Sequence, residues 1–377
     1  MKTFLRVLLP AAAAAAIWAA VRPPDIPFEK HTLDLGANET CAVADINGDG
    51  KVDIVSGENW YEAPTWKKHH FRDLPYSNYY IDNFSDLPLD VNGDGRIDIV
   101  GCSWFAHRVV WFENPGRDGA PWKEHLVETR SPVEFAFLVD IDNDGKKNEV
   151  LPQFGDGSAP LTWYEARGGT LVGHTVSNRS YGHGIGAGDV NGDHRTDILT
   201  QKGWFEAPVD PRSGEWKFHA DWDLGDLGFI NTLDVNGDGK NDIVTSMAHG
   251  YGIFWLEQGD GGKWTKHVID ESWSQSHAMT MVDLNGDGRM DLVTGKRFWA
   301  HNGHDPGGHE PLGIYWYEYI PPAQKGGNIE WVRHVVDYGG RTGGGMQIPV
   351  ADLDGDGDLD FVVAGKSGLF LFENKTR

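Results

Sequence analysis

Seven short stretches of the chain place side-chain oxygens at alternate positions, which is the arrangement a loop needs to bind a hard cation. The first reads DINGDGKVD from Asp45 and the last reads DLDGDGDLD from Asp352. Oxygen ligands fall at positions 1, 3, 5 and 9, position 7 offers its carbonyl, and a glycine at position 6 allows the sharp turn. The stretches predict up to seven Ca²⁺ sites, with these ligands: Asp45, Asn47, Asp49, Asp53, Asp90, Asn92, Asp94, Asp98, Asp140, Asp142, Asp144, Asn148, Asp189, Asn191, Asp193, Asp197, Asp234, Asn236, Asp238, Asp242, Asp283, Asn285, Asp287, Asp291, Asp352, Asp354, Asp356 and Asp360.

Two of these loops depart from the pattern. Asn148 replaces the last aspartate of the third loop, and His194 replaces the glycine of the fourth, where a left-handed backbone is costly. No loop has an acid at position 12, and a β-rich run such as VDIV or IDIV follows most of them. We therefore expect strand–loop–strand hairpins and not EF-hands.

The elements that must position these loops form a repeat. The loops begin 45 to 69 residues apart, a period that indicates a solenoid or a propeller. Each unit adds a strand of the WYEAP type, as at Trp60, and a strand of the WKKH type, as at His69, which gives four short strands. The sequence predicts an all-β, seven-bladed β-propeller with a calcium hairpin loop in each blade.

Two further expectations follow from the repeat. The chain begins with an unpaired fourth strand near EKHTLDL and stops after a third strand, LFLFEN, so the first strand should complete the last blade and close the ring. A histidine that recurs once per blade should be structural. Those histidines are His31, His69, His125, His174, His219, His267 and His334.

The loops and the unit length resemble the FG-GAP/VCBS repeat family, which builds the propellers of integrin α-chains and of many secreted bacterial proteins. The resemblance covers about residues 28–374. It implies the propeller fold and bound calcium. It does not define an activity, because one fold hosts many functions.

One unit carries an insertion that no other unit has, KRFWAHNGHDPGGHEP from Lys296 to Pro311. It joins the second and third strands, so it should lie on the face opposite the calcium loops, at the mouth of the central channel. The residue six positions before each loop should enter an inner strand on that same face. The candidate catalytic residues are His183, His277, Glu134, His301, His304, His309, Lys296 and Arg297; the candidate substrate-binding residues are Glu39, Tyr80, Asp82, His107, Lys202, Asn231, His249 and Gln347.

Neutral imidazoles with a carboxylate suit one Zn²⁺ or another divalent metal at the channel mouth. Such a site fits proton abstraction beside a carbonyl followed by β-elimination, as in a carbohydrate lyase or dehydratase. The fold also loosely resembles the propeller of aldos-2-ulose dehydratases. The alternative is a secreted binding or adhesion propeller that recognises a glycan or a protein. The alternative for the insertion is a solvated Gly/Pro loop with incidental histidines, and the alternative for His183 and His277 is that they are polar residues hydrogen-bonded to channel water.

Composition sets the remaining expectations. Residues 1–20 read as a signal peptide, residues 21–27 as a short linker and residues 28–374 as the propeller, which predicts a secreted or periplasmic protein. No later apolar run could span a membrane, and a net charge of −23 argues against nucleic acid as a partner. The expected partner is a carbohydrate or another small-molecule or polysaccharide ligand.

Cys41 and Cys102 lie in strand-like runs and are expected to be buried thiols. The oligomeric state stays open.

Overall fold

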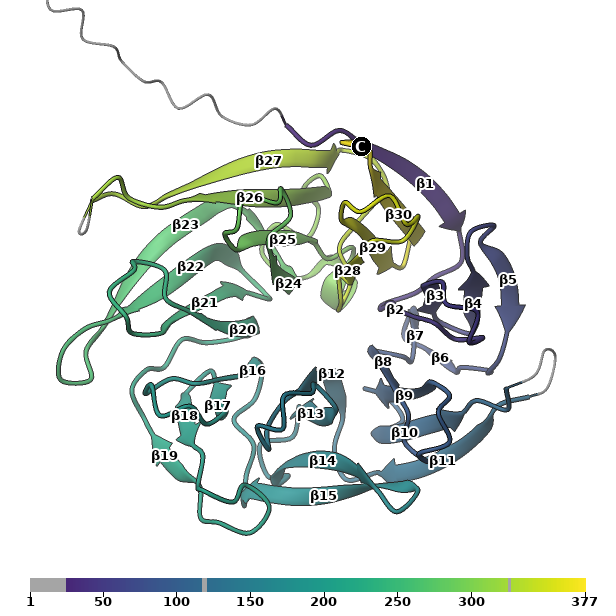
Figure 1. The fold of residues 1–377 in the computed structure, drawn as a ribbon, viewed down its shortest axis with the longest axis horizontal. Coiled ribbons are helices and arrows are strands. Elements are labelled where there is room, and N and C mark those ends of the chain that lie inside the picture. Colours follow the sequence, from purple (N-terminus) through teal and green to yellow (C-terminus); the bar gives the residue numbers. More distant parts are fainter. Residues whose placement is uncertain (1–24, 117–120, 325–326) are drawn as a thin grey trace, which may run out of the picture.

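The computed structural model describes residues 25–116, 121–324 and 327–377. The expected signal peptide, residues 1–20, lies outside these ranges, as does most of the expected linker. Sheets built of short strands form a ring around a central axis, and each four-stranded sheet has one edge strand near the centre and the other at the rim (Figure 1). The prediction of an all-β propeller is confirmed. No helix in the described ranges is long and apolar enough to cross a membrane.

Five separate four-stranded sheets are blades of this propeller. The first holds β2 (Ala42–Ala44), β3 (Asp53–Ser56), β4 (Asn59–Glu62) and β5 (Lys67–His70). The second holds β8 (Ser85–Leu89), β9 (Asp98–Ser103), β10 (Arg108–Glu113) and β11 (Lys123–Glu128). The third holds β12 (Val133–Val139), β13 (Glu149–Phe154), β14 (Leu161–Arg167) and β15 (Thr170–Ser177).

The fourth holds β24 (Ser276–Val282), β25 (Asp291–Lys296), β26 (Gly313–Ile320) and β27 (Glu330–Tyr338). The fifth joins the two ends of the chain. In it, β1 (Phe28–Asp34) pairs antiparallel with β30 (Gly368–Asn374), and β29 (Asp360–Gly365) and β28 (Val350–Ala351) follow toward the centre. This pairing covers the edge of β30 that would otherwise stay open.

One sheet has eight strands. Its first half is β19 (Lys217–His219), β18 (Gly203–Glu206), β17 (Asp197–Thr200) and β16 (Ile185–Gly188). Its second half is β20 (Leu227–Leu233), β21 (Asp242–Met247), β22 (Tyr251–Gln258) and β23 (Trp264–Ser274). The halves meet where β16 and β20 pair in parallel over two residue pairs. A separate hairpin, β6 (Tyr76–Ser77) and β7 (Tyr80–Ile81), precedes the second blade.

The repeated tryptophan and histidine pack against each other inside the blades. In the first blade the rings of Trp60 and His69 stack with centroids 4.1 Å apart, and His69 Nε2 lies 2.8 Å from a carboxylate oxygen of Glu62. The same stack recurs with His125, His174, His219, His267 and His334. These histidines therefore join the third and fourth strands of their blades, which is the structural role expected for them.

In six of the seven loops, position 9 is an aspartate that is buried and hydrogen-bonded to the backbone of its blade. Asp98 is fully buried, and its two carboxylate oxygens accept the backbone N–H groups of Val91 and Asn114. The loop is thereby fixed to the end of the third strand. In the third loop it is Glu149, and not the predicted ligand Asn148, that accepts the equivalent N–H of Ile141. The sequence pattern did not separate this structural role from cation binding.

Candidate functional site

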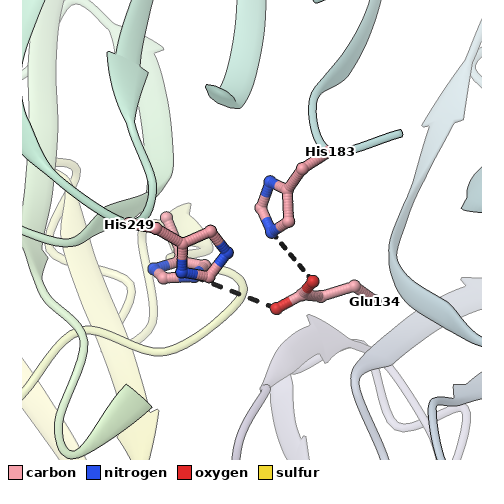
Figure 2. A group of neighbouring side chains, drawn as sticks. Glu134, His183 and His249 are labelled. Carbon is pink, nitrogen blue, oxygen red and sulfur yellow. Dashed lines mark ion pairs between the residues drawn. The ribbon is translucent and has the colours of Figure 1, made fainter. Parts of the chain in front are cut away.

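Four side chains from four different units meet at the channel mouth. Glu134 comes from β12, His183 precedes β16, His249 lies in the β21–β22 turn, and His277 comes from β24. One ligand atom of each lies within 4.8 Å of those of the others. Figure 2 shows Glu134 and His183 facing each other, with His249 across from them. Consecutive strands of a blade run antiparallel. The start of the innermost strand and the turn between the second and third strands therefore lie on the same face of the propeller, and residues far apart in the sequence meet there.

Each of the three imidazoles is oriented through its Nδ1 atom. His183 Nδ1 donates to the carbonyl of Leu227 at 2.6 Å, and His277 Nδ1 donates to the carbonyl of Gln275 at 3.4 Å. His249 Nδ1 lies 3.0 Å from Oδ2 of Asp305, to which it donates. An imidazole that uses Nδ1–H in this way presents its other nitrogen as the ligand atom, which is the usual arrangement of metal-binding histidines.

The Nε2 atoms of His277 and His183 make no hydrogen bond within the protein. His277 is fully buried, and its Nε2 makes no hydrogen bond and lies 3.9 Å from Oε1 of Glu134. His183 Nε2 lies 2.8 Å from Oε2 of Glu134 as an ion pair, but outside good hydrogen-bond geometry. Buried polar atoms are seldom left without a partner, so this cluster fits a further group that the imidazoles and the carboxylate would share.

Burial and charge set the protonation of the cluster. Burial, with Arg297 and His249 nearby, holds the pKa of His277 well below its usual range, and burial with His183 lowers the pKa of His249 to about 4. Both rings are therefore neutral near pH 7, the form that binds metals. Burial opposes the charge of Glu134, but His183, Arg297 and His277 outweigh it and keep its pKa well below 4.5.

Arg297 connects this cluster to a second acid. Its guanidinium lies 2.9 Å from Oε1 of Glu134 and 3.2 Å from Oε2 of Glu39, and all three side chains are almost completely buried. Lys366, in the β29–β30 turn, lies 3.3 Å above the ring of Tyr80 and donates to the carbonyl of Trp299. Burial lowers the pKa of Lys366 to about 8, although Glu39 opposes this shift.

The insertion reaches the cluster, but only through some of its residues. It contains a 3₁₀ turn, η1 (Ala300–Gly303), which lies near the centre of the ring beside β28 in Figure 1. His301 stacks on His249 with centroids 4.2 Å apart, and Asp305 binds the Nδ1 atoms of both rings. The predicted His304 and His309 point elsewhere: both are exposed, and the contact of His309 is with Trp299.

The other residues predicted for this site have different surroundings. Lys296 is buried and donates to the hydroxyl of Ser274, away from the cluster. Asp82 accepts three backbone N–H groups from residues 104–106, and the Gln347 side chain accepts the N–H of Asp86. Lys202 pairs with a surface aspartate, and His107 is exposed. Asn231 lines a cavity of about 290 Å³ together with Asp140, a calcium-loop residue.

Sequence reasoning assigned His249 to substrate binding and missed Asp305 and Lys366. Each had a weak signal. Asp305 follows His301 by one helical turn inside the unusual insertion, and Lys366 lies in the second turn of its blade, as His249 does. Polar residues in turns are common, however, so this signal alone did not distinguish them.

Two of the acidic loops bring three carboxylates together. The carboxylates of Asp140, Asp142 and Asp144 lie within 4.8 Å of one another, as do those of Asp352, Asp354 and Asp356. Carboxylate oxygens at this spacing repel one another unless a cation is bound. The donor chemistry fits Ca²⁺, which prefers oxygen ligands.

The fold and the loops define the class: this is a β-propeller with FG-GAP-like repeats. The model of the FG-GAP-like repeat matches residues 90–151 and 234–294, each of which includes two of the acidic loops. No curated protein matches the sequence at a significant level.

Solved structures are similar in fold. BBS1N in its complex with ARL6DN has a TM-score of 0.53 at 9% identity, over 93% of this chain and 97% of that one. An Agrocybe aegerita lectin that recognises non-reducing terminal N-acetylglucosamine has a TM-score of 0.45 at 17% identity, over 80% of each chain. The biofilm matrix protein Bap1 of V. cholerae has a TM-score of 0.46 at 13% identity, over 93% of this chain and 92% of that one.

Proposed function

We propose that this protein is a secreted binding propeller that holds a divalent metal at its channel mouth and uses this centre to bind a carbohydrate. One observation carries the proposal: three imidazoles with anchored Nδ1 atoms gather around the buried carboxylate of Glu134, and Nε2 of the buried His277 has no hydrogen-bond partner. A purely structural cluster would be expected to satisfy the nitrogen of His277 within the protein.

The donor set selects the kind of metal. Imidazole nitrogens suit zinc, copper, iron and nickel, whereas calcium and magnesium prefer oxygen. His183, His249 and His277 would hold the metal with Glu134, and Asp305 would orient His249 from outside. A metal bound there would supply a Lewis acid that attracts ligand oxygens.

The proposal includes seven blades and loop-bound calcium. The two halves of the eight-stranded sheet each contain four consecutive antiparallel strands, and only two residue pairs connect them, which supports counting them as two blades. Calcium in the loops is supported by the converging carboxylates. Secretion is supported by the sequence of residues 1–20, where two basic residues precede an apolar run.

Elemental analysis of the untagged mature protein tests the metal centre. We expect about one zinc or other transition metal per chain, which is lost in a His183→Ala/His277→Ala variant. His309→Ala is the matched control, since His309 is an exposed histidine outside the cluster. A native protein that binds no transition metal after incubation with zinc, or equal metal in all three proteins, would rule out this centre.

A second candidate function is metal-assisted β-elimination from a sugar. The observation that favours it is Lys366, whose pKa of about 8 allows it to exchange a proton near neutral pH beside the cluster. Ultraviolet absorbance of unsaturated uronide products would test this activity. If a saccharide binds but no unsaturated product forms, the protein is a binding propeller and not a lyase.

A further inference from the structure

Several buried polar atoms beside the cluster have no hydrogen-bond partner within the protein, and some of them are acceptors whereas others are donors. Glu39 Oε1 and Gln275 Oε1 are acceptors that receive no hydrogen, whereas Arg297 Nε is a donor without an acceptor. All three side chains are at most 2% exposed. A hydroxyl group can both donate and accept, so a ligand that carries several hydroxyls would satisfy this mixture.

The charge around these atoms favours an anionic group on the same ligand. Within the described ranges, no carboxylate lies within 4.0 Å of Lys366 Nζ, whose acceptor is the carbonyl of Trp299. Arg297 is already shared between Glu39 and Glu134. A divalent cation bound at the cluster would add two further positive charges beyond those of Arg297 and Lys366, and a ligand carboxylate would offset part of that charge.

Exposed aromatic rings lie next to the same region. The β6–β7 hairpin touches the insertion, where Asn302 Nδ2 donates to Oδ1 of Asn78, and its Tyr80 lies under Lys366. At the hairpin turn Tyr79 is 79% exposed with a φ of 69°, and Tyr76 is 60% exposed. A bulky residue in the left-handed region is uncommon and often marks a functional position.

We propose that the ligand is a saccharide that carries a carboxylate, with its acidic sugar at the metal and Lys366 and its neighbouring sugar against Tyr79. This inference rests on the proposed metal centre. The acidic sugar supplies hydroxyls to Glu39 and Arg297, and the exposed tyrosine supplies an apolar surface for a sugar ring. A neutral saccharide would place no carboxylate in direct contact with Lys366, whose hydrogen-bond acceptor is the carbonyl of Trp299.

Calorimetry with the metal-loaded mature protein tests the inference, using glucuronate, galacturonate and digalacturonate against glucose and galactose. We expect at least one acidic sugar to bind about tenfold or more tightly than its neutral counterpart, since a charge-assisted contact is lost in the latter. Lys366→Met should weaken acidic-sugar binding about tenfold. Tyr79→Ala should weaken digalacturonate binding severalfold and leave monosaccharide binding nearly unchanged.

Matched controls separate these effects from general damage. Lys202→Met removes an exposed lysine that pairs with Asp223, and Tyr338→Ala removes an exposed tyrosine on the outer strand of another blade. Both should bind like the native protein. Metal content and melting temperature of every variant report whether it folds and still holds metal.

The outcomes distinguish the two proposals. A metal-loaded protein that binds neither acidic sugar, or that binds neutral sugars equally well, overturns the inference and leaves the metal centre in place. A protein that binds no transition metal overturns both. If Lys366→Met or Tyr79→Ala folds and binds digalacturonate like the native protein, the assigned subsite is wrong.

Discussion

At the scale of single residues, the geometry of the channel-mouth cluster depends on the hydrogen-bond partner of each histidine Nδ1 atom. His249 is oriented by Asp305, His183 by the carbonyl of Leu227, and His277 by the carbonyl of Gln275. Asp305 is the only one of these partners that is a side chain, and it comes from the insertion. The insertion therefore contributes the Asp305 carboxylate that orients His249 and the Arg297 guanidinium that pairs with Glu134, although its histidines drew attention to it in the sequence.

Removing that carboxylate should weaken metal binding without removing any ligand. We expect Asp305→Ala to raise the Kd for zinc about 10- to 100-fold, because His249 would lose the partner that fixes its tautomer and ring orientation. Zinc competition with a chromophoric chelator measures this change. His304→Ala alters an exposed histidine of the same insertion and should keep the native Kd. Equal affinity in both variants would mean that Asp305 does not position His249.

At the scale of elements, each loop is fixed to its blade by a buried acid. The carboxylate at position 9 accepts one N–H from the loop and another from the end of the third strand, as Asp98 does with Val91 and Asn114. The same pair of contacts recurs for Asp53, Asp197, Asp242, Asp291 and Asp360. The loops are therefore part of the blade framework as well as candidate calcium sites.

Changing this acid to its amide should destabilise the protein even without calcium. We expect Asp98→Asn to lower the free energy of unfolding by about 1–3 kcal/mol, because an amide nitrogen would face a buried backbone N–H. Chemical denaturation in calcium-free buffer measures the loss. Asp73→Asn is the control, since the Asp73 side chain is 95% exposed, and it should unfold like the native protein. An unchanged Asp98→Asn protein would refute the structural role of the carboxylate.

At the scale of the whole molecule, the ring brings distant parts of the chain together. The first described strand, β1, pairs with the last strand, β30, and Arg297 connects Glu39 of the first unit with Glu134 of the third. The acidic loops and the cluster of Glu134 with its three histidines occupy opposite ends of the blades. With both metals bound as proposed, we expect them to serve separate purposes, with calcium for stability and the channel-mouth metal for ligand binding.

Chelation should reveal the contribution of calcium to the stability of the ring. We expect excess chelator to lower the melting temperature by many degrees and added Ca²⁺ to restore it, because an ion that binds only the folded state stabilises it by mass action. Differential scanning fluorimetry on the His183→Ala/His277→Ala variant isolates the loops, since that variant lacks two of the four proposed channel-mouth ligands. A melting curve that does not respond to chelator would contradict calcium in the loops.

The sequence by itself determined the β-propeller fold and the repeated loops, because strand alternation and loop spacing are local properties of the chain. Counting back from each loop also identified Glu134, His183 and His277, since each unit places that position on the same strand end. Only the tertiary structure decided the rest of the site. The direction of the insertion's side chains depends on left-handed backbone at Trp299, His301 and Asn302. The meeting of Asp305 with His249, and of Lys366 with Tyr80, depends on how separate blades pack around one axis, and no local pattern encodes that packing.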